Sequence, residues 1–194
     1  DWNIDSEVGM SQRRRFLRRG FLALAALSGG AAVLGQQGGF SDQQLRAAFV
    51  LNFLRYVDWP ERSFASQEAP LILGVLGGES PANLAGISGK IVKGHPVAVR
   101  SVYGIDDAKG CHALYFSDPD VRRIVTLLRG LQNLPVLTVS DAEGFIDIGG
   151  MIGLVPGDNR LQFEVNLSGL SQAQLKASSQ LLRLARNVID TRAR

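Results

Sequence analysis

Cys111 and His112 are the adjacent residues with the clearest capacity for chemistry, since they are the only cysteine and one of the two histidines in the chain. A thiolate beside an imidazole base is the arrangement that cysteine nucleophiles use. Neighbouring side chains on a strand, however, point to opposite faces of the sheet, and no orienting carboxylate is evident. We therefore expect Cys111 to be a small buried core residue, and a secreted hydrolase is the least favoured function. The other histidine, His95, precedes Pro96 and is interpreted as a loop residue.

Other patterns that would bind cofactors or metals are incomplete. Gly74, Gly77 and Gly78 follow a predicted strand, where a phosphate-binding turn would lie, but their spacing matches neither a dinucleotide motif nor a P-loop. The acidic residues occur at predicted turns and helix starts, where capping explains them. One cysteine and two histidines also exclude a disulfide scaffold and a Cys/His zinc module. The sequence therefore predicts no catalytic, cofactor or metal site.

An amide and a group of aromatic residues end the first helix predicted in the folded region. Asn52 lies on or beside the apolar face of this helix, and a buried amide needs hydrogen-bond partners. It therefore either ties down a neighbouring loop or touches a ligand. The aromatic residues after it are core or a partner contact, because tyrosine and tryptophan dominate binding hot spots. The residues predicted to contact a partner are Asn52, Phe53, Tyr56 and Trp59.

The elements that must position these residues alternate between strands and helices. Ser41 and Gln44 form a capping box, so a helix is predicted from near Asp42 to before Pro60. Ser171 is predicted to cap a final helix that continues to about Ile189. Short apolar runs predict strands at 71–76, 96–102, 113–116, 136–139, 151–155 and 161–165, and further helices are predicted at 81–84 and 120–131.

This order of elements defines the fold class. Strands that alternate with helices predict an α/β fold with a mostly parallel sheet. Pro156-Gly157-Asp158-Asn159 joins the last two predicted strands as a hairpin, which makes one pair antiparallel and the sheet mixed. The prediction is a single-domain layered α/β sandwich with a mixed, mostly parallel sheet and a C-terminal helix.

The first 35 residues have the order of an export signal. A basic stretch is followed by the apolar segment Gly20–Leu34 and then by small residues. The run Arg13-Arg14-Arg15-Phe16-Leu17-Arg18 resembles the twin-arginine export signature. We predict an export signal at 10–35, cleaved near Gly35, and a single periplasmic domain at 36–194. Retention as an N-terminal anchor is the alternative, but the apolar segment is shorter than the ~20 residues of a spanning helix.

The basic excess of the chain belongs to this N-terminal segment. The whole chain has 21 basic and 18 acidic residues. Without the five arginines and three acidic residues of positions 1–35, 16 basic and 15 acidic residues remain, a net charge of +1. A nucleic-acid-binding domain would carry a basic stripe of its own, so no nucleic-acid partner is expected.

A series of motifs resembles the YfiR/HmsC-like periplasmic family over roughly residues 42–189. The series begins with Phe49-x-x-Asn52-Phe53-x-Arg55-Tyr56-Val57-x-Trp59-Pro60. It continues in order with Gly94-His95-Pro96-Val97, Gly110-Cys111-His112, Pro135-Val136-Leu137-Thr138-Val139, Gly149-Gly150-Met151-Ile152, Phe163-x-Val165-Asn166 and Ser178-Ser179-Gln180-Leu181-Leu182-Arg183-Leu184-Ala185. The family commonly has arginine in place of His95.

The resemblance implies regulation by binding and no catalysis. Better-understood members bind the periplasmic sensing region of an inner-membrane diguanylate cyclase, and so hold down cyclic di-GMP synthesis and biofilm formation. An outer-membrane lipoprotein can sequester such a repressor, and homodimers occur. Some members carry disulfides that make repression redox-sensitive, but the lone Cys111 cannot form one within this chain.

The sequence leaves a second function open. A periplasmic receptor for a small molecule, feeding a membrane signalling partner, would bind its ligand near Gly77-Gly78. This loop follows a predicted parallel strand, and ligands of open α/β sheets bind outside the carboxyl ends of the strands.

Overall fold

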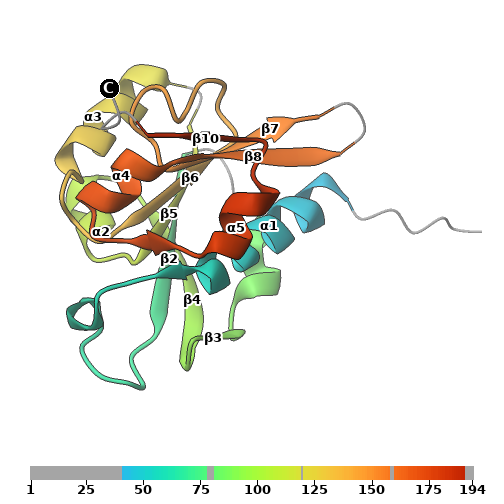
Figure 1. The fold of residues 1–194 in the computed structure, drawn as a ribbon. Coiled ribbons are helices and arrows are strands. Elements are labelled where there is room, and N and C mark those ends of the chain that lie inside the picture. The colour runs from blue at the N-terminus through green and yellow to red at the C-terminus, as the bar shows by residue number, and fades with distance from the viewer. Residues whose placement is uncertain (1–40, 78–80, 119, 158–159, 191–194) are drawn as a thin grey trace, which may run out of the picture. The chain divides into compact units, whose positions relative to one another are not determined.

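Helices and strands alternate along the part of the chain that the computed structural model of the protein describes, residues 41–77, 81–118, 120–157 and 160–190. These residues form a single domain (Figure 1). Its helices are α1 Asp42–Tyr56, η1 Glu61–Ser63, η2 Pro81–Ile87, α2 Ile105–Lys109, α3 Val121–Gly130, α4 Leu167–Gln172 and α5 Ser179–Leu184, of which η1 and η2 are 3-10 helices. Its strands are β1 Val57–Asp58, β2 Leu71–Gly77, β3 Ile91–Val92, β4 His95–Val102, β5 Ala113–Ser117, β6 Leu137–Ser140, β7 Ile152–Pro156, β8 Leu161–Asn166, β9 Lys176–Ala177 and β10 Asn187–Ile189.

Eight of these strands form one sheet in the order β10-β8-β7-β6-β5-β2-β4-β3. Within the run β7-β6-β5-β2-β4, each strand is parallel to the next one in the run, and β10 is parallel to β8. The β7–β8 hairpin and the short edge pair β3–β4 are antiparallel. The predicted mixed, mostly parallel sheet is therefore confirmed. The remaining strands, β1 and β9, pair with each other away from this sheet.

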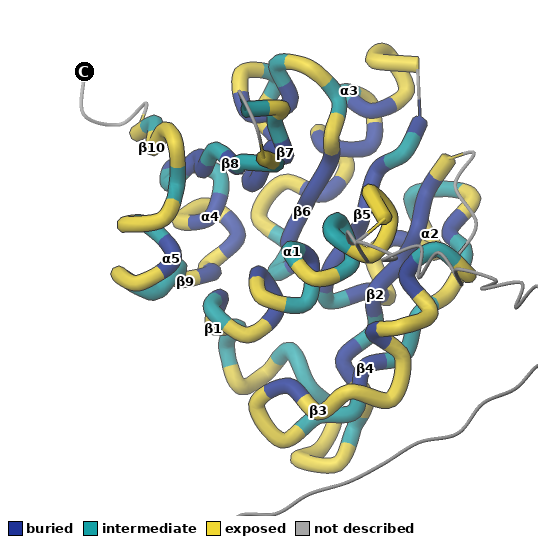
Figure 2. The backbone as a smooth tube through the Cα atoms, turned by 90° about the vertical axis from the view of Figure 1, so that its right-hand side faces the viewer, coloured by how far each residue is buried: buried dark blue, intermediate teal, exposed yellow. Residues whose placement is uncertain are grey.

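Side chains of the central strands feed a separate core on each face of the sheet. Along β5, Ala113 and Tyr115 point to one face and Leu114 and Phe116 to the other, because successive side chains of a strand alternate. The first core lies under α1, α4 and α5, and the second lies under α2 and α3. Figure 2 shows β5 and β6 buried along most of their length between these layers. The layered α/β class is confirmed.

The predicted helix starts are confirmed where a cap is encoded locally. At α1, the Ser41 hydroxyl accepts from the Gln44 backbone N–H, and the Gln44 side chain accepts from the Ser41 N–H. At α3, the Asp120 carboxylate accepts from the Arg122 N–H at 3.0 Å. Such caps replace the hydrogen bonds that the first turn of a helix lacks.

The single final helix predicted at 171–189 is wrong. The chain leaves α4 through Gln174, whose φ of 59° is left-handed, and then pairs as β9 with β1. Ser178 caps the short α5. Arg186 then donates to the Phe163 carbonyl and joins β10 to the edge of the sheet. The C-terminal helix of the predicted fold class is thus α5. Backbone pairing with distant strands overrides the local helical pattern.

The structure also contains short elements that the sequence did not predict. These include β1, β3, β9, the 3-10 helix η1 and the five-residue helix α2, in addition to α4 and β10 of the C-terminal region. His95 opens β4 and pairs with Val92, so its interpretation as a loop residue is wrong. Two- to five-residue elements carry too little periodicity to be read from a pattern.

Gly74 tests how tightly the second core is packed. A Cβ at this position would lie 2.6 Å from both Leu114 Cδ2 and Val102 Cγ2, and 2.9 Å from Cys111 Sγ. Gly74→Ala is expected to lower the free energy of unfolding by about 1–3 kcal/mol, measured by urea denaturation. Gly86→Ala is the matched control, because a Cβ there meets no atom within 4 Å. Equal effects of the two substitutions would contradict the packing.

Candidate functional site

The four residues predicted to contact a partner lie at different depths. Phe53 is 1% exposed and packs its ring against Phe163, with ring centroids 5.1 Å apart. Asn52 is exposed. The buried stripe of α1 runs through Val50, Phe53 and Leu54 and continues at Val57, so Asn52 falls outside it. Phe53 is therefore a core residue, one of the two roles considered for the aromatic residues, and Asn52 is not a buried amide.

Tyr56 and Trp59 are half-buried, and both are bonded to distant segments. The Trp59 indole N–H donates to the His112 carbonyl at 2.9 Å. The Tyr56 hydroxyl accepts from the Gln180 side chain at 3.3 Å, and the Tyr56 carbonyl accepts from the Ser178 N–H at 2.8 Å. Tyr56 thus ties the end of α1 to the start of α5. Both aromatic side chains combine a structural contact with a partly accessible edge.

His112 organises the segment that follows Trp59. Its Nδ1 accepts from the Ile72 N–H at 3.0 Å, so the ring proton of the neutral imidazole lies on Nε2. Nε2 in turn donates to the Ser63 carbonyl at 2.9 Å. Burial lowers the pKa of His112 below its ordinary value of 6.5, and the nearby His95 adds to this effect. The neutral ring therefore serves as a fixed structural link.

Both histidines of the chain stack on one phenylalanine. The Phe64 ring lies 3.8 Å from the His95 ring and 4.4 Å from the His112 ring, nearly parallel to both. His95 Nδ1 lies 2.7 Å from the Ala69 carbonyl. This sandwich holds the loop between η1 and β2 against the sheet.

Cys111 lies on the opposite face of the sheet from His112, as the strand alternation predicted. It is 5% exposed and belongs to the second core, with Sγ 3.5 Å from both Arg100 Nη2 and the Asp107 carbonyl. Burial raises the pKa of the thiol. The predicted core role of Cys111 is confirmed, and the two side chains form no dyad. Among the described residues, no group of three or more His, Cys, Asp or Glu side chains is placed to hold a metal ion.

The carboxyl edge of the sheet is tightly packed where it is described. Gly77 has a φ of 113°, and a Cβ there would lie 2.5 Å from the backbone N of Asp118. The buried Asp118 carboxylate pairs with Arg123 at 2.8 Å. Gly78, the other half of the predicted ligand loop, lies outside the described residues. The described part of this edge is therefore filled by the close approach of Gly77 to the Asp118 backbone and by a carboxylate that is already paired with Arg123.

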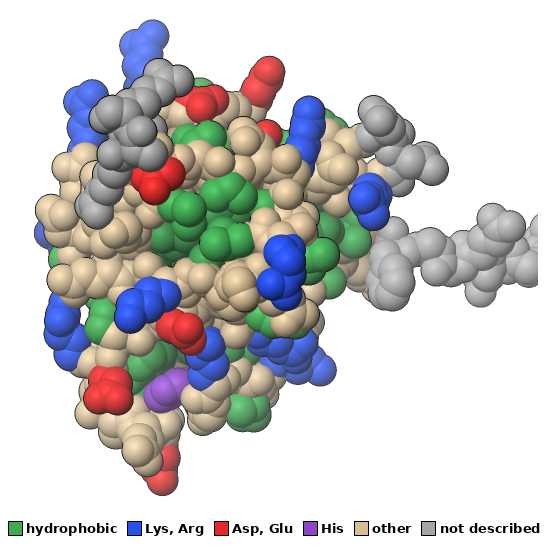
Figure 3. Space-filling model, viewed as in Figure 1, with side chains coloured by type: hydrophobic (Ala, Val, Ile, Leu, Met, Phe, Trp, Pro, Cys, Tyr) green, Lys and Arg blue, Asp and Glu red, His purple; other side chains and the backbone are tan. Residues whose placement is uncertain are grey.

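A large, partly apolar depression lies beside α4 and β9, and we call it the C-terminal hollow. It has a volume of about 720 Å³, and its walls include Leu167, Leu170, Leu175, Lys176, Ala177 and Asp190. Figure 3 shows hydrophobic side chains gathered at the centre of this face. The sequence did not reveal the hollow, because it exists only when the chain breaks the predicted final helix into three elements.

Two exposed apolar side chains follow the C-terminal hollow in the chain. Leu184 at the end of α5 is 66% exposed, and Val188 on the edge strand β10 is 37% exposed. Large apolar groups at the surface can mark interaction sites when they form a patch.

The chain belongs to the family described as YfiR/HmsC-like, which matches residues 43–186. This is a family of periplasmic regulatory proteins, and the resemblance predicted from the motifs is confirmed. Among the described residues, no helix has both the length and the apolar content needed to cross a membrane.

Solved structures show similarity to the fold at low sequence identity. A conserved domain protein from Vibrio cholerae matches with 12% identity and a TM-score of 0.50, over 77% of this chain and 60% of that one. An ABC domain in complex with L-Trp from Streptococcus pneumonia matches with 12% identity and a TM-score of 0.43, over 61% and 55% of the two chains. This chain therefore spans less than two thirds of the length of either protein.

The neutral state of His112 makes stability depend on pH. Because its pKa is lowered in the folded protein, the unfolded chain binds the proton more tightly. Its contribution to stability is present above about pH 6.5 and is lost as the pH falls below that value toward the folded pKa. We expect the imidazole titration of His112, followed by NMR, to have a midpoint below 6.5. We also expect the free energy of unfolding to decline across this window.

The matched variant for this prediction is His112→Gln, which removes the titrating group. It is expected to be less stable at neutral pH, because Ile72 and Ser63 lose their side-chain partner. Its stability should nevertheless change less with pH below 6.5 than that of the wild type. The same decline in both proteins would contradict the assignment.

Proposed function

We propose that this protein is a periplasmic regulator that binds the periplasmic sensing region of an inner-membrane diguanylate cyclase and represses it. Membership of the YfiR/HmsC-like family is the observation that carries the proposal. The sequence of residues 10–35 supports export through a twin-arginine-like signal. The proposed role needs no catalytic group on this chain, only a surface with a preferred partner.

Repression by such a protein is a population shift. A ligand moves a two-state equilibrium only as far as its affinities for the two states differ. A regulator that binds the inactive state of the sensing region about 100-fold more tightly shifts the equilibrium by about 2.7 kcal/mol. An outer-membrane lipoprotein that competes for the regulator would release the cyclase, and a homodimer would bring two docking surfaces together.

The docking surface proposed here combines the C-terminal hollow with the accessible end of α1. Tyr56 adjoins the hollow, because its carbonyl and hydroxyl bond to the residues that follow Ala177. Asn52 lies one turn before Tyr56 on α1 and is exposed, and Trp59 contributes its accessible edge. Phe53 supports the surface from beneath. Leu184 extends the proposed surface along α5.

An apolar segment of the sensing region is the partner that this surface suits. The hollow is lined by leucine and alanine side chains together with Ser171, Gln174, Lys176 and Asp190. Apolar centres surrounded by polar rims are the usual anatomy of specific protein interfaces. Leucine anchors inserted into such a depression would supply affinity, and the rim would set orientation.

Leu184→Asp tests the docking surface directly. The exposed position tolerates a charge in the free protein, but a buried carboxylate would oppose binding. We expect the dissociation constant for the purified sensing region, measured by calorimetry, to rise at least about tenfold. The matched control is Ile91→Asp on the opposite sheet edge, where the native side chain is 61% exposed. Similar losses in the two variants, at unchanged stability, would contradict this surface.

A second candidate function is a periplasmic receptor for a small molecule that feeds a membrane signalling partner. One observation favours it, a cavity of about 280 Å³ between α3, the loop before β7 and α4. This cavity lies at the amino ends of the parallel strands β6 and β7, whereas Gly77 lies at the carboxyl end of β2. The two functions are compatible, because a ligand bound here would adjoin α4, which also borders the C-terminal hollow.

A further inference from the structure

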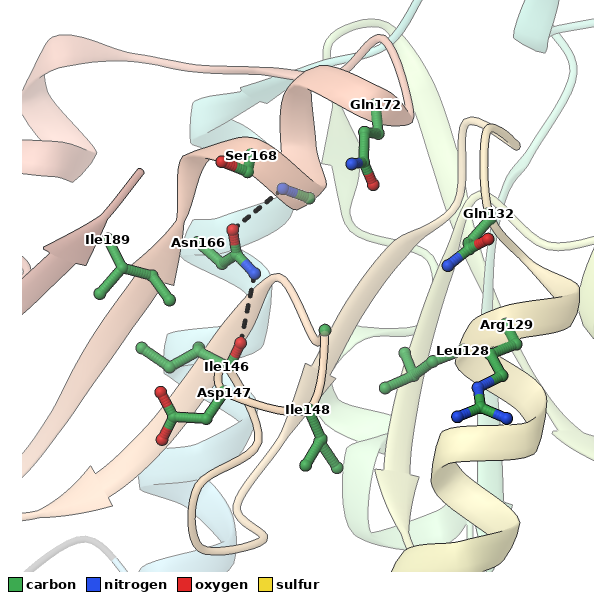
Figure 4. Close-up of a pocket in the computed structure, with 12 residues that line it drawn as sticks. Leu128, Arg129, Gln132, Ile146, Asp147, Ile148, Asn166, Ser168, Gln172 and Ile189 are labelled. Atoms are coloured by element: carbon green, nitrogen blue, oxygen red, sulfur yellow. Dashed lines mark hydrogen bonds between the residues drawn. The ribbon is translucent and has the colours of Figure 1, made fainter. Parts of the chain in front are cut away.

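The cavity beside α4 has walls that are held in place by buried hydrogen bonds. The carboxamide of Asn166, which is 6% exposed, donates to the Ile146 carbonyl at 3.2 Å and accepts from the Gly169 N–H at 3.0 Å. The buried Ser168 hydroxyl donates to Asp190 at 2.8 Å. Figure 4 shows the Asn166 bonds bridging two sides of the cavity. A cavity whose walls are fixed in advance loses little freedom when a ligand enters.

Three polar side chains around this cavity are available to a ligand. Arg129 and Gln132 lie three residues apart at the end of α3, on the same side of the cavity, and Gln172 reaches in from α4 (Figure 4). Within the described part of the chain, no hydrogen bond or ion pair joins any of these three side chains to another residue. The guanidinium and the two amides therefore keep their hydrogen-bonding capacity for a bound molecule.

The rest of the lining consists of aliphatic side chains, two glycines, the already bonded Asn166 and Ser168, and one carboxylate. Leu128, Ile146, Ile148 and Ile189 contribute aliphatic surface. Asp147 lies across the cavity from Arg129 and makes no ion pair with it (Figure 4). A ligand with one negative charge matches this layout, because a second negative charge would face Asp147. The volume of about 280 Å³ is at the lower limit of pockets for drug-sized molecules, so it suits a smaller one.

We propose that this cavity binds a small organic monocarboxylate with an aliphatic body, whose carboxylate is bound by Arg129. A planar guanidinium donates two parallel hydrogen bonds to a carboxylate. The aliphatic body lies against Leu128, Ile146 and Ile148. The inference rests on the second proposed function, the small-molecule receptor, and is independent of the cyclase.

Binding of sodium hexanoate to the full mature domain tests the proposal, with chemical shifts of backbone amides as the readout. We expect saturable shifts at residues 146–149 and 166–172. Arg129→Gln should weaken binding by at least about tenfold, since it removes a charge-assisted contact. Arg122→Gln is the matched control, because this exposed arginine lies on the same helix but does not line the cavity. It should leave the affinity unchanged.

Three further probes separate the ligand class from the receptor function. Adipate should bind more weakly than hexanoate, and Asp147→Asn should reduce that difference. Hexylamine and hexanamide should bind at least about tenfold more weakly than hexanoate. If either of these two binds in the same cavity as tightly as hexanoate, the receptor function stands and the carboxylate assignment is overturned. If no probe gives saturable shifts, or Arg129→Gln has no effect on hexanoate binding, the proposed site is overturned.

Discussion

Backbone pairing between β1 and β9 is the constraint on which the proposed surfaces depend. Two residue pairs, Val57 with Ala177 and Asp58 with Lys176, join the end of α1 to a segment more than a hundred residues later. This pairing breaks the C-terminal region into α4, α5 and β10, and it brings Tyr56 beside Ser178. The C-terminal hollow lies beside α4 and β9, so its place depends on this pairing.

The chain that follows β1, from Trp59 to Ile72, is held in place by His112. The imidazole bonds two backbone groups, its own carbonyl holds Trp59, and Phe64 stacks between it and His95. The residues that seemed suited to chemistry are therefore structural: Cys111 fills one core and His112 organises the other face. The function of a fold has to be argued from its sites, and here the candidates are a surface and a cavity.

The sheet and α1 could be predicted because their signals are local. Apolar runs bounded by glycine or proline marked the buried strands, and Ser41 with Gln44 marked the start of α1. The C-terminal region could not be predicted, because Leu175, Leu182 and Ile189 recur at helical spacing, whereas the backbone of β9 and β10 pairs with the distant strands β1 and β8. For Asn52, the sequence could not decide between a buried and an exposed amide, since a pattern of apolar residues does not fix the edge of a helix's buried stripe.

The central claim is periplasmic repression of a diguanylate cyclase, and intracellular cyclic di-GMP in the native host measures it most directly. The account predicts that deleting the gene raises cyclic di-GMP. An exported copy should restore the original level, and a copy that lacks residues 10–35 should not. An unchanged level after deletion, with the wild-type protein shown to be expressed and exported, would contradict the claim. Restoration by the copy without the export signal would contradict a periplasmic site of action.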